Sequence, residues 1–153
     1  MKKILLSLWL LSSVAFSEVT NMEVTKEFIE ANKIKIIDIR TEQEWIMMGV
    51  LPSAYLLTFF DEDQEYSPKM FLKELDKIVK KDEQFAIISN SASRTKLVSN
   101  FLGKKHDYKV INLTGGMVKL IKDGYSVKVY DPSKIYPIVE ELKASEEDNS
   151  TKE

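Results

Sequence analysis

Six consecutive residues near the middle of the chain have the types and spacing of an anion-binding turn. They read Ser-Asn-Ser-Ala-Ser-Arg, from Ser89 to Arg94. The uncharged, partly β-branched run at 85–88 predicts a strand buried on both faces, and the apolar spacing from Thr95 onward predicts a helix that ends at Gly103. A short polar turn between a buried strand and a helix start directs several backbone N–H groups toward one point. We therefore expect this turn to bind a small anion.

Arginine is used at only two positions, and all other basic residues are lysine. The guanidinium group offers a rigid fork for two parallel hydrogen bonds, whereas the lysine ammonium group is a point charge. We expect Arg94 to face the ligand or brace the turn, although it could also be an exposed residue at the start of the helix. For Arg40 we expect a structural ion pair with Asp38 or Glu44.

The serines of the turn allow other interpretations. Ser89, Ser91 and Ser93 could simply shape the loop and cap the helix. A serine hydrolase would need a general base beside its nucleophile. The only histidine, His106, lies beyond the predicted helix, and the chain has no Gly-x-Ser-x-Gly motif. The residues therefore argue against a hydrolase, and they predict neither a metal site nor a cofactor.

The composition predicts one exported domain. The chain has 153 residues, of which 44% are hydrophobic, enough for one packed core. Residues 1–17 combine a basic start, an apolar run and small residues at Ala15 and Ser17, the pattern of a secretory signal peptide. The apolar run is shorter than the roughly 20 residues that span a bilayer, so a retained anchor is the weaker alternative. We expect a periplasmic or secreted protein.

Export would also fix the charge of the mature chain. Removal of residues 1–17 takes away two lysines, which leaves 20 basic and 24 acidic residues, a net charge of −4. This charge argues against nucleic acid as a partner. The absence of cysteine excludes disulfides and thiolate metal ligands.

Strands and helices are predicted to alternate along the chain. The helices are expected at 25–32, 42–48, 68–79, 95–103 and 117–121, and the strands at 34–39, 85–88 and 108–113, with an extended segment at 55–60. This order predicts an α/β fold with a central parallel sheet flanked by helices on both faces. We assign the domain to 18–130, a C-terminal helix to 131–143 and a polar, disordered tail to 144–153.

Three motifs besides the turn stand in a fixed order. Asp38-Ile39-Arg40 ends the first predicted strand, and Glu44 is followed by Gly49 and Pro52-Ser53-Ala54. Leu113-Thr114-Gly115-Gly116 follows the last predicted strand. Together with the turn, these motifs resemble the rhodanese-like family of sulfurtransferases over residues 24–129. The resemblance is incomplete, because Val50 and Ser53 stand where the family often has His and Gly, and Leu120 replaces the usual Trp.

The resemblance implies a role for each residue of the turn. Ser89 falls at the position of the catalytic cysteine, and Arg94 is the arginine that closes the six-residue loop. Related phosphatases use a loop that is one residue longer. The intervening positions, Asn90, Ser91, Ala92 and Ser93, together with Thr95 after the loop, would form the anion-binding loop. In the family, the cysteine thiolate takes a sulfane sulfur from a donor such as thiosulfate and passes it on from a persulfide.

Serine at position 89 changes this expectation. Oxygen forms no stable counterpart of the persulfide, so the chain as written should not transfer sulfur. Either the natural protein carries Ser89, which we favour because the signal sequence is retained, or a cysteine was replaced on purpose in a competent thiosulfate or sulfane-sulfur sulfurtransferase. The expected ligand is a small sulfur compound or oxyanion, and the sequence names no protein partner.

Two further loop positions depart from the family pattern. Ala92 stands where the family usually has Gly, and a left-handed backbone there would cost about 1 kcal/mol. Thr95 stands where Ser is common, and we expect its hydroxyl to cap the helix.

Overall fold

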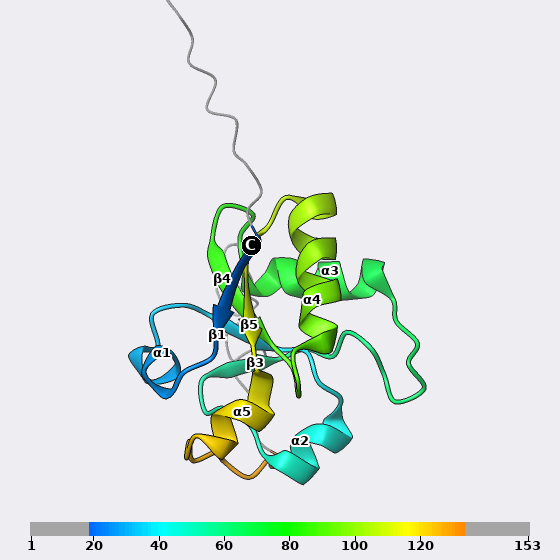
Figure 1. Ribbon diagram of the computed structural model, residues 1–153. Helices are drawn as coiled ribbons and strands as arrows, with labels where there is room; N and C mark the ends of the chain where they lie inside the picture. Colours follow the sequence, from blue (N-terminus) through cyan, green and yellow to red (C-terminus); the bar gives the residue numbers. More distant parts are fainter. Residues whose placement is uncertain (1–18, 134–153) are drawn as a thin grey trace, which may run out of the picture.

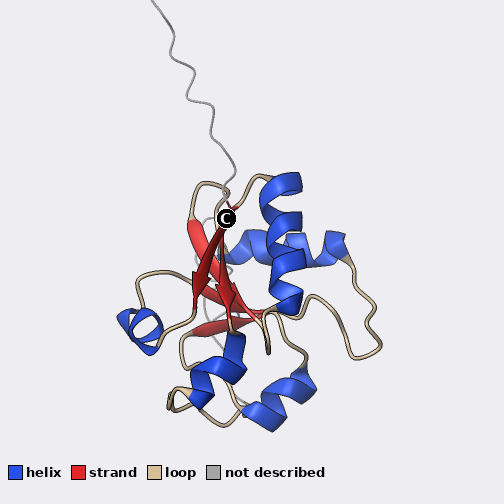
Figure 2. Ribbon diagram, viewed as in Figure 1, coloured by secondary structure: helices blue, strands red, loops and turns tan. Residues whose placement is uncertain are grey.

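The computed structural model describes residues 19–133, which form a five-stranded parallel sheet in the order β1-β5-β4-β2-β3 (Figures 1 and 2). The strands are β1 Val19–Glu23, β2 Ile36–Asp38, β3 Ala54–Leu56, β4 Gln84–Ile88 and β5 Lys109–Thr114. The helices are α1 Lys26–Ala31, α2 Glu42–Met48, α3 Pro68–Ile78, α4 Ser93–Asn100, the π-helix η1 Phe101–Lys105, and α5 Gly116–Lys122.

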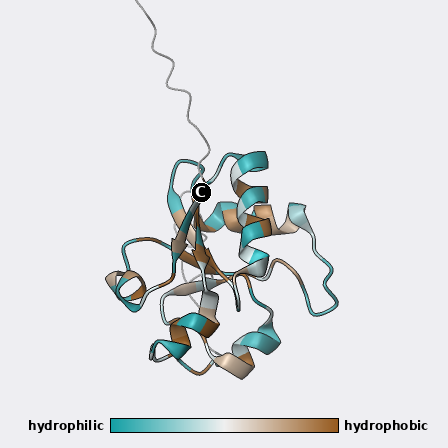
Figure 3. Cartoon of the chain, viewed as in Figure 1, coloured by the Kyte–Doolittle hydropathy of each residue, from teal (hydrophilic) through white to brown (hydrophobic). Residues whose placement is uncertain are grey.

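Helices cover both faces of the sheet, as the alternation of elements predicts. Along β4, Phe85 and Ile87 belong to one core cluster, which α3 and α4 cover, while Ala86 and Ile88 belong to the other, which α1 and α5 cover (Figure 1). Brown, apolar residues occur along the strands and as patches on the helices, where they alternate with teal, polar ones (Figure 3). The α/β prediction is confirmed.

The predicted signal peptide, most of the predicted C-terminal helix and the predicted tail lie outside the described residues. Of the C-terminal helix, the structure describes only residues 131–133, which lie in a turn. Within 19–133, no helix is long and apolar enough to cross a bilayer.

Strand β1 was not predicted from the sequence. Its residues Val-Thr-Asn-Met-Glu contain no apolar run, and all of them are partly or fully exposed. The strand forms by pairing with β5, with Asn21 opposite Asn112 and the Asn112 Nδ2 group donating to Asn21 Oδ1 at 2.8 Å. Tertiary pairing therefore outweighs weak local preference at this edge of the sheet.

The prediction that the helix ends at Gly103 is wrong. The helical backbone continues as η1 to Lys105, and the left-handed residue that follows is Asp107, with φ of 57°. Gly103 lies inside η1 against β1, where a Cβ atom would come within 2.4 Å of Val19 Cγ2. Gly103 is therefore needed for its small size, which lets η1 pack closely against β1, and not for a turn at the end of the helix.

Threonine side chains cap the starts of α1 and α2. Thr25 Oγ1 accepts a hydrogen bond from the Phe28 amide at 3.2 Å. Thr41 and Glu44 form a complete capping box at the start of α2. Within α2, Trp45 is buried, whereas Met47 is 82% exposed.

Candidate functional site

The turn Ser89–Arg94 lies at the carboxyl end of β4, a central strand of the sheet. Ligands of open parallel sheets bind at this edge. Ser89 is fully buried, and within the described part of the chain its Oγ atom has no hydrogen-bond partner. The Asn90 Oδ1 atom is likewise buried without a partner there. Of these two atoms, the Ser89 hydroxyl can donate to an anion, whereas the Asn90 amide oxygen is an acceptor and needs a donor.

The start of α5 holds the first two carbonyl groups of the turn. The Met117 amide donates to Ser89 O at 2.9 Å, and the Val118 amide donates to Asn90 O at 3.0 Å. By contrast, the amides of 90–94 donate no hydrogen bond to any acceptor in residues 19–133. These N–H groups remain available to an anion.

Gly116 is required for this contact. Its φ is +61°, and a Cβ atom would lie 2.5 Å from both Ser89 O and Asn90 O. The preceding Gly115 also has a positive φ, of 85°. The Gly115-Gly116 motif thus lets the start of α5 approach the turn closely enough to bond its carbonyl groups.

Ala92 adopts a left-handed backbone conformation, with φ of 70° and ψ of 0°. The energetic cost considered for this position in the sequence analysis therefore applies. Thr95 does not cap α4 as expected. The helix begins earlier, at Ser93, and the Thr95 hydroxyl donates to Ala92 O at 2.9 Å. The threonine thereby braces the strained residue instead of accepting from a helix amide.

Arg94 braces the turn through an ion pair with Glu44. Its Nη1 and Nη2 atoms donate to Glu44 Oε2 and Oε1 at 2.7 and 2.5 Å. The two side chains are 20% and 22% exposed, so solvent screens the pair only in part. The pair connects the N-terminal turn of α4 to α2.

Arg40 pairs with Asp38, one of the two partners the sequence offered. Both side chains are fully buried, and Arg40 Nη2 donates to Asp38 Oδ2 at 2.7 Å. The same Nη2 atom donates to Gly49 O at 2.8 Å. Arg40 therefore ties the end of β2 to the residue that follows α2, and has a structural role.

The pKa of Glu44 lies below its ordinary value of 4.5. Burial acts to raise this pKa, but the hydrogen bonds from Arg94 and from the Thr41 amide, with the charges of Arg94 and Arg40, outweigh it. Glu44 is therefore ionised at neutral pH, and it serves the capping box and Arg94 at once.

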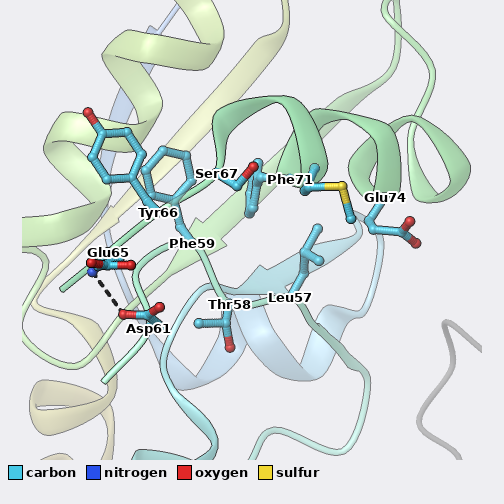
Figure 4. A pocket seen from close by; sticks show the side chains of 10 residues that line it. Leu57, Thr58, Phe59, Asp61, Glu65, Tyr66, Ser67, Phe71 and Glu74 are labelled. Carbon is cyan, nitrogen blue, oxygen red and sulfur yellow. Dashed lines mark hydrogen bonds between the residues drawn. The ribbon is translucent and has the colours of Figure 1, made fainter. Parts of the chain in front are cut away.

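A polar cavity of about 350 Å³ lies beside the end of the turn. Its lining residues are Thr41, Gln43, Glu44, Glu62, Gln64 and Arg94. A more apolar cavity of about 400 Å³ lies between the segment after β3 and α3, with Phe59, Tyr66 and Phe71 among its walls (Figure 4). The Asp61 carboxylate in this second cavity accepts from the Glu65 amide at 2.8 Å. No residue of the turn lines the second cavity.

His106 follows η1, so α4 and η1 separate it from Ser89 along the chain. Its ring packs against Phe101, with 4.5 Å between the ring centroids. The structure therefore places no histidine at the turn. Within the described residues, no group of three His, Cys, Asp or Glu side chains could hold a metal ion.

The left-handed Ala92 gives a first test. We expect Ala92→Gly to raise the free energy of unfolding by about 1 kcal/mol, because glycine adopts this conformation without the Cβ penalty. Ala31→Gly, at the end of α1, is the control and should lower it by about 0.5 to 1 kcal/mol. Urea denaturation measures both. An Ala92→Gly protein less stable than the parent would contradict this account of the loop.

The lowered pKa of Glu44 gives a second test. Ionised Glu44 contributes stability above its ordinary pKa of 4.5, and this contribution is lost as the pH falls through the lower folded-state value. We expect Glu44→Gln to reduce the free energy of unfolding at neutral pH by about 1 to 2 kcal/mol. The difference should shrink in acid. Denaturant unfolding of both proteins across this range checks it, and a pH-independent difference would exclude the ion pair as its source.

Comparisons with known proteins agree on the fold. The sequence profile of the Rhodanese-like domain family matches residues 21–123. Similar solved structures include a rhodanese-like domain protein from Staphylococcus aureus, with 21% identity over 71% of this chain and 98% of that chain and a TM-score of 0.49. A rhodanese-related protein from Thermoplasma volcanium has 17% identity, covers 71% of this chain and 98% of that chain, and has a TM-score of 0.50.

At 17% identity and a TM-score of 0.50, the likeness to the Thermoplasma volcanium structure shows the fold alone. A search of curated proteins finds no match. The profile, however, covers well over half of the chain and includes the turn and every strand except the start of β1. The chain belongs to the rhodanese-like domain family.

Proposed function

We propose that this protein is a non-catalytic rhodanese-like domain whose turn Ser89–Arg94 binds a small sulfur oxyanion. The observation that carries the proposal is the fully buried Ser89 hydroxyl, whose Oγ atom has no partner in the described chain. A buried polar group left unsatisfied costs about 1 to 3 kcal/mol. An anion accepting from this hydroxyl and from the amides of 90–94 would satisfy all of these donors.

The proposal of a non-catalytic role rests on the chemistry of oxygen. Sulfur transfer needs a thiolate that attacks the sulfane sulfur and carries it as a persulfide, and a cysteine near a helix N-terminus ionises readily. The serine hydroxyl remains protonated at neutral pH, and an oxygen–sulfur adduct is no equivalent carrier. The loop can still hold the anion, because its backbone amides do not depend on the nucleophile.

Restoring the thiol tests whether the turn Ser89–Arg94 can still bind thiosulfate in a position that allows sulfur transfer. We expect Ser89→Cys to convert thiosulfate and cyanide to thiocyanate and sulfite, while the parent protein shows no turnover. Ser91→Cys is the matched control, because it places a thiol on an exposed residue of the same loop. Turnover by the parent protein would contradict the non-catalytic role. Equal rates for the two cysteine variants would contradict an anion-binding turn that acts specifically on the residue at position 89.

We also propose that the protein is exported, on the support of the basic, apolar and small-residue pattern of residues 1–17. Expression of the full chain in a bacterium with a general secretion pathway should yield a mature protein that starts at Glu18 in the exported fraction. Leu10→Arg, which interrupts the apolar run, should abolish export. Intact chain retained in the cytoplasm would contradict the proposal. N-terminal sequencing of each fraction reads the outcome.

A further inference from the structure

We infer that Glu44 makes the anion-binding turn selective for singly charged sulfonate-type anions over dianions such as sulfate. This inference rests on the proposed function, and it concerns the charge of the ligand that the turn accepts. Two independent features carry it: the pairing of Arg94 within the protein, and the excess of carboxylates beside the turn.

The Arg94 guanidinium group is already occupied. Both of its terminal nitrogens donate to the Glu44 carboxylate, at 2.7 and 2.5 Å, in the two-pronged arrangement that a sulfonate or sulfate would otherwise take. The pair carries no net charge. A ligand at the turn therefore meets neutral amide and hydroxyl donors and a neutralised arginine, instead of a free cation.

The surroundings of this pair are negative. The polar cavity at Arg94 is lined by one cationic side chain and two carboxylates, Glu44 and Glu62, and Gln43 Nε2 donates to Glu62 Oε2 at 2.7 Å. An adjoining cavity shares Thr41 and Glu62 with it, and its other walls contribute three further carboxylates, those of Glu42, Asp61 and Asp63.

The lysine packed against Gly115 does not offset these charges. The ammonium group of Lys119 is paired with both Asp123 and Glu23. The carboxylates that line these cavities therefore oppose negative charge at the Arg94 end of the turn, where the exposed Lys96 is the nearest further lysine along the chain.

Coulomb energy is proportional to the charge of the ligand, so the same field opposes a dianion twice as strongly as a monoanion. The neutral donors of the turn favour both ligands. Glu44 is the carboxylate in direct contact with the loop arginine, and it therefore has the largest single effect on this balance. Removing its charge should release the Arg94 fork and favour the dianion most.

The test compares sulfate with methanesulfonate, two tetrahedral anions that differ by one charge. Calorimetric titration of the full chain should show methanesulfonate binding at least as tightly as sulfate. Glu44→Gln keeps a residue that can complete the capping box but removes the charge. We expect both affinities to rise, and because the energy scales with ligand charge, a gain of about threefold for methanesulfonate should accompany a gain of about tenfold for sulfate.

The control is Glu30→Gln on α1, an exposed position that removes the same charge away from α2 and α4 (Figure 1). It should leave the ratio of the two affinities unchanged. Equal gains for the two anions in Glu44→Gln, or no change, would overturn the proposed selectivity for singly charged anions while leaving anion binding intact. Lower affinity for both anions would overturn it too, because Glu44 would then position Arg94 for the ligand. Absence of binding by the parent and the variant would overturn the proposed function as well.

Discussion

The contact between Gly116 and the turn after β4 determines the rest of the site. Helix α5 begins close enough to the turn for the Met117 and Val118 amides to bond Ser89 O and Asn90 O. A Cβ atom at Gly116 would lie 2.5 Å from both oxygens, so only glycine permits the approach. With these two carbonyl groups turned toward α5, the amides of 90–94 keep no protein acceptor within the described chain and can bind an anion.

The two arginines form different ion pairs, one buried and one partly exposed. Arg40 is buried with Asp38 and fixes the end of β2 against the residue that follows α2. Arg94 links the start of α4 to Glu44, which also completes the capping box of α2. The turn is therefore held at both ends. Amides at the start of α5 bind the carbonyl groups of Ser89 and Asn90, and Glu44 of α2 binds Arg94. These contacts fix the position of the turn relative to the two helices.

Local patterns in the sequence predict much of this arrangement. The apolar run before Ser89 locates β4, and the helix expected at 42–48 is α2. Strand β1 could not be predicted, because its polar residues form a strand only by pairing with β5. The role of Gly103 depends on contact with Val19, which is distant in sequence. Likewise, the capping-box pattern explains Glu44 locally but does not show that its carboxylate also binds Arg94, 50 residues away.

The most direct test of the central claim is to locate a bound anion on the backbone. Titration of sulfate or methanesulfonate into isotope-labelled protein, followed by amide resonances in NMR spectra, reports on each N–H group separately. The account predicts saturable shifts concentrated at the amides of 90–94, with smaller changes at Met117 and Val118, which bond the same turn. Shifts confined to exposed lysine-rich segments such as Lys104 and Lys105, with none in the turn, would contradict it.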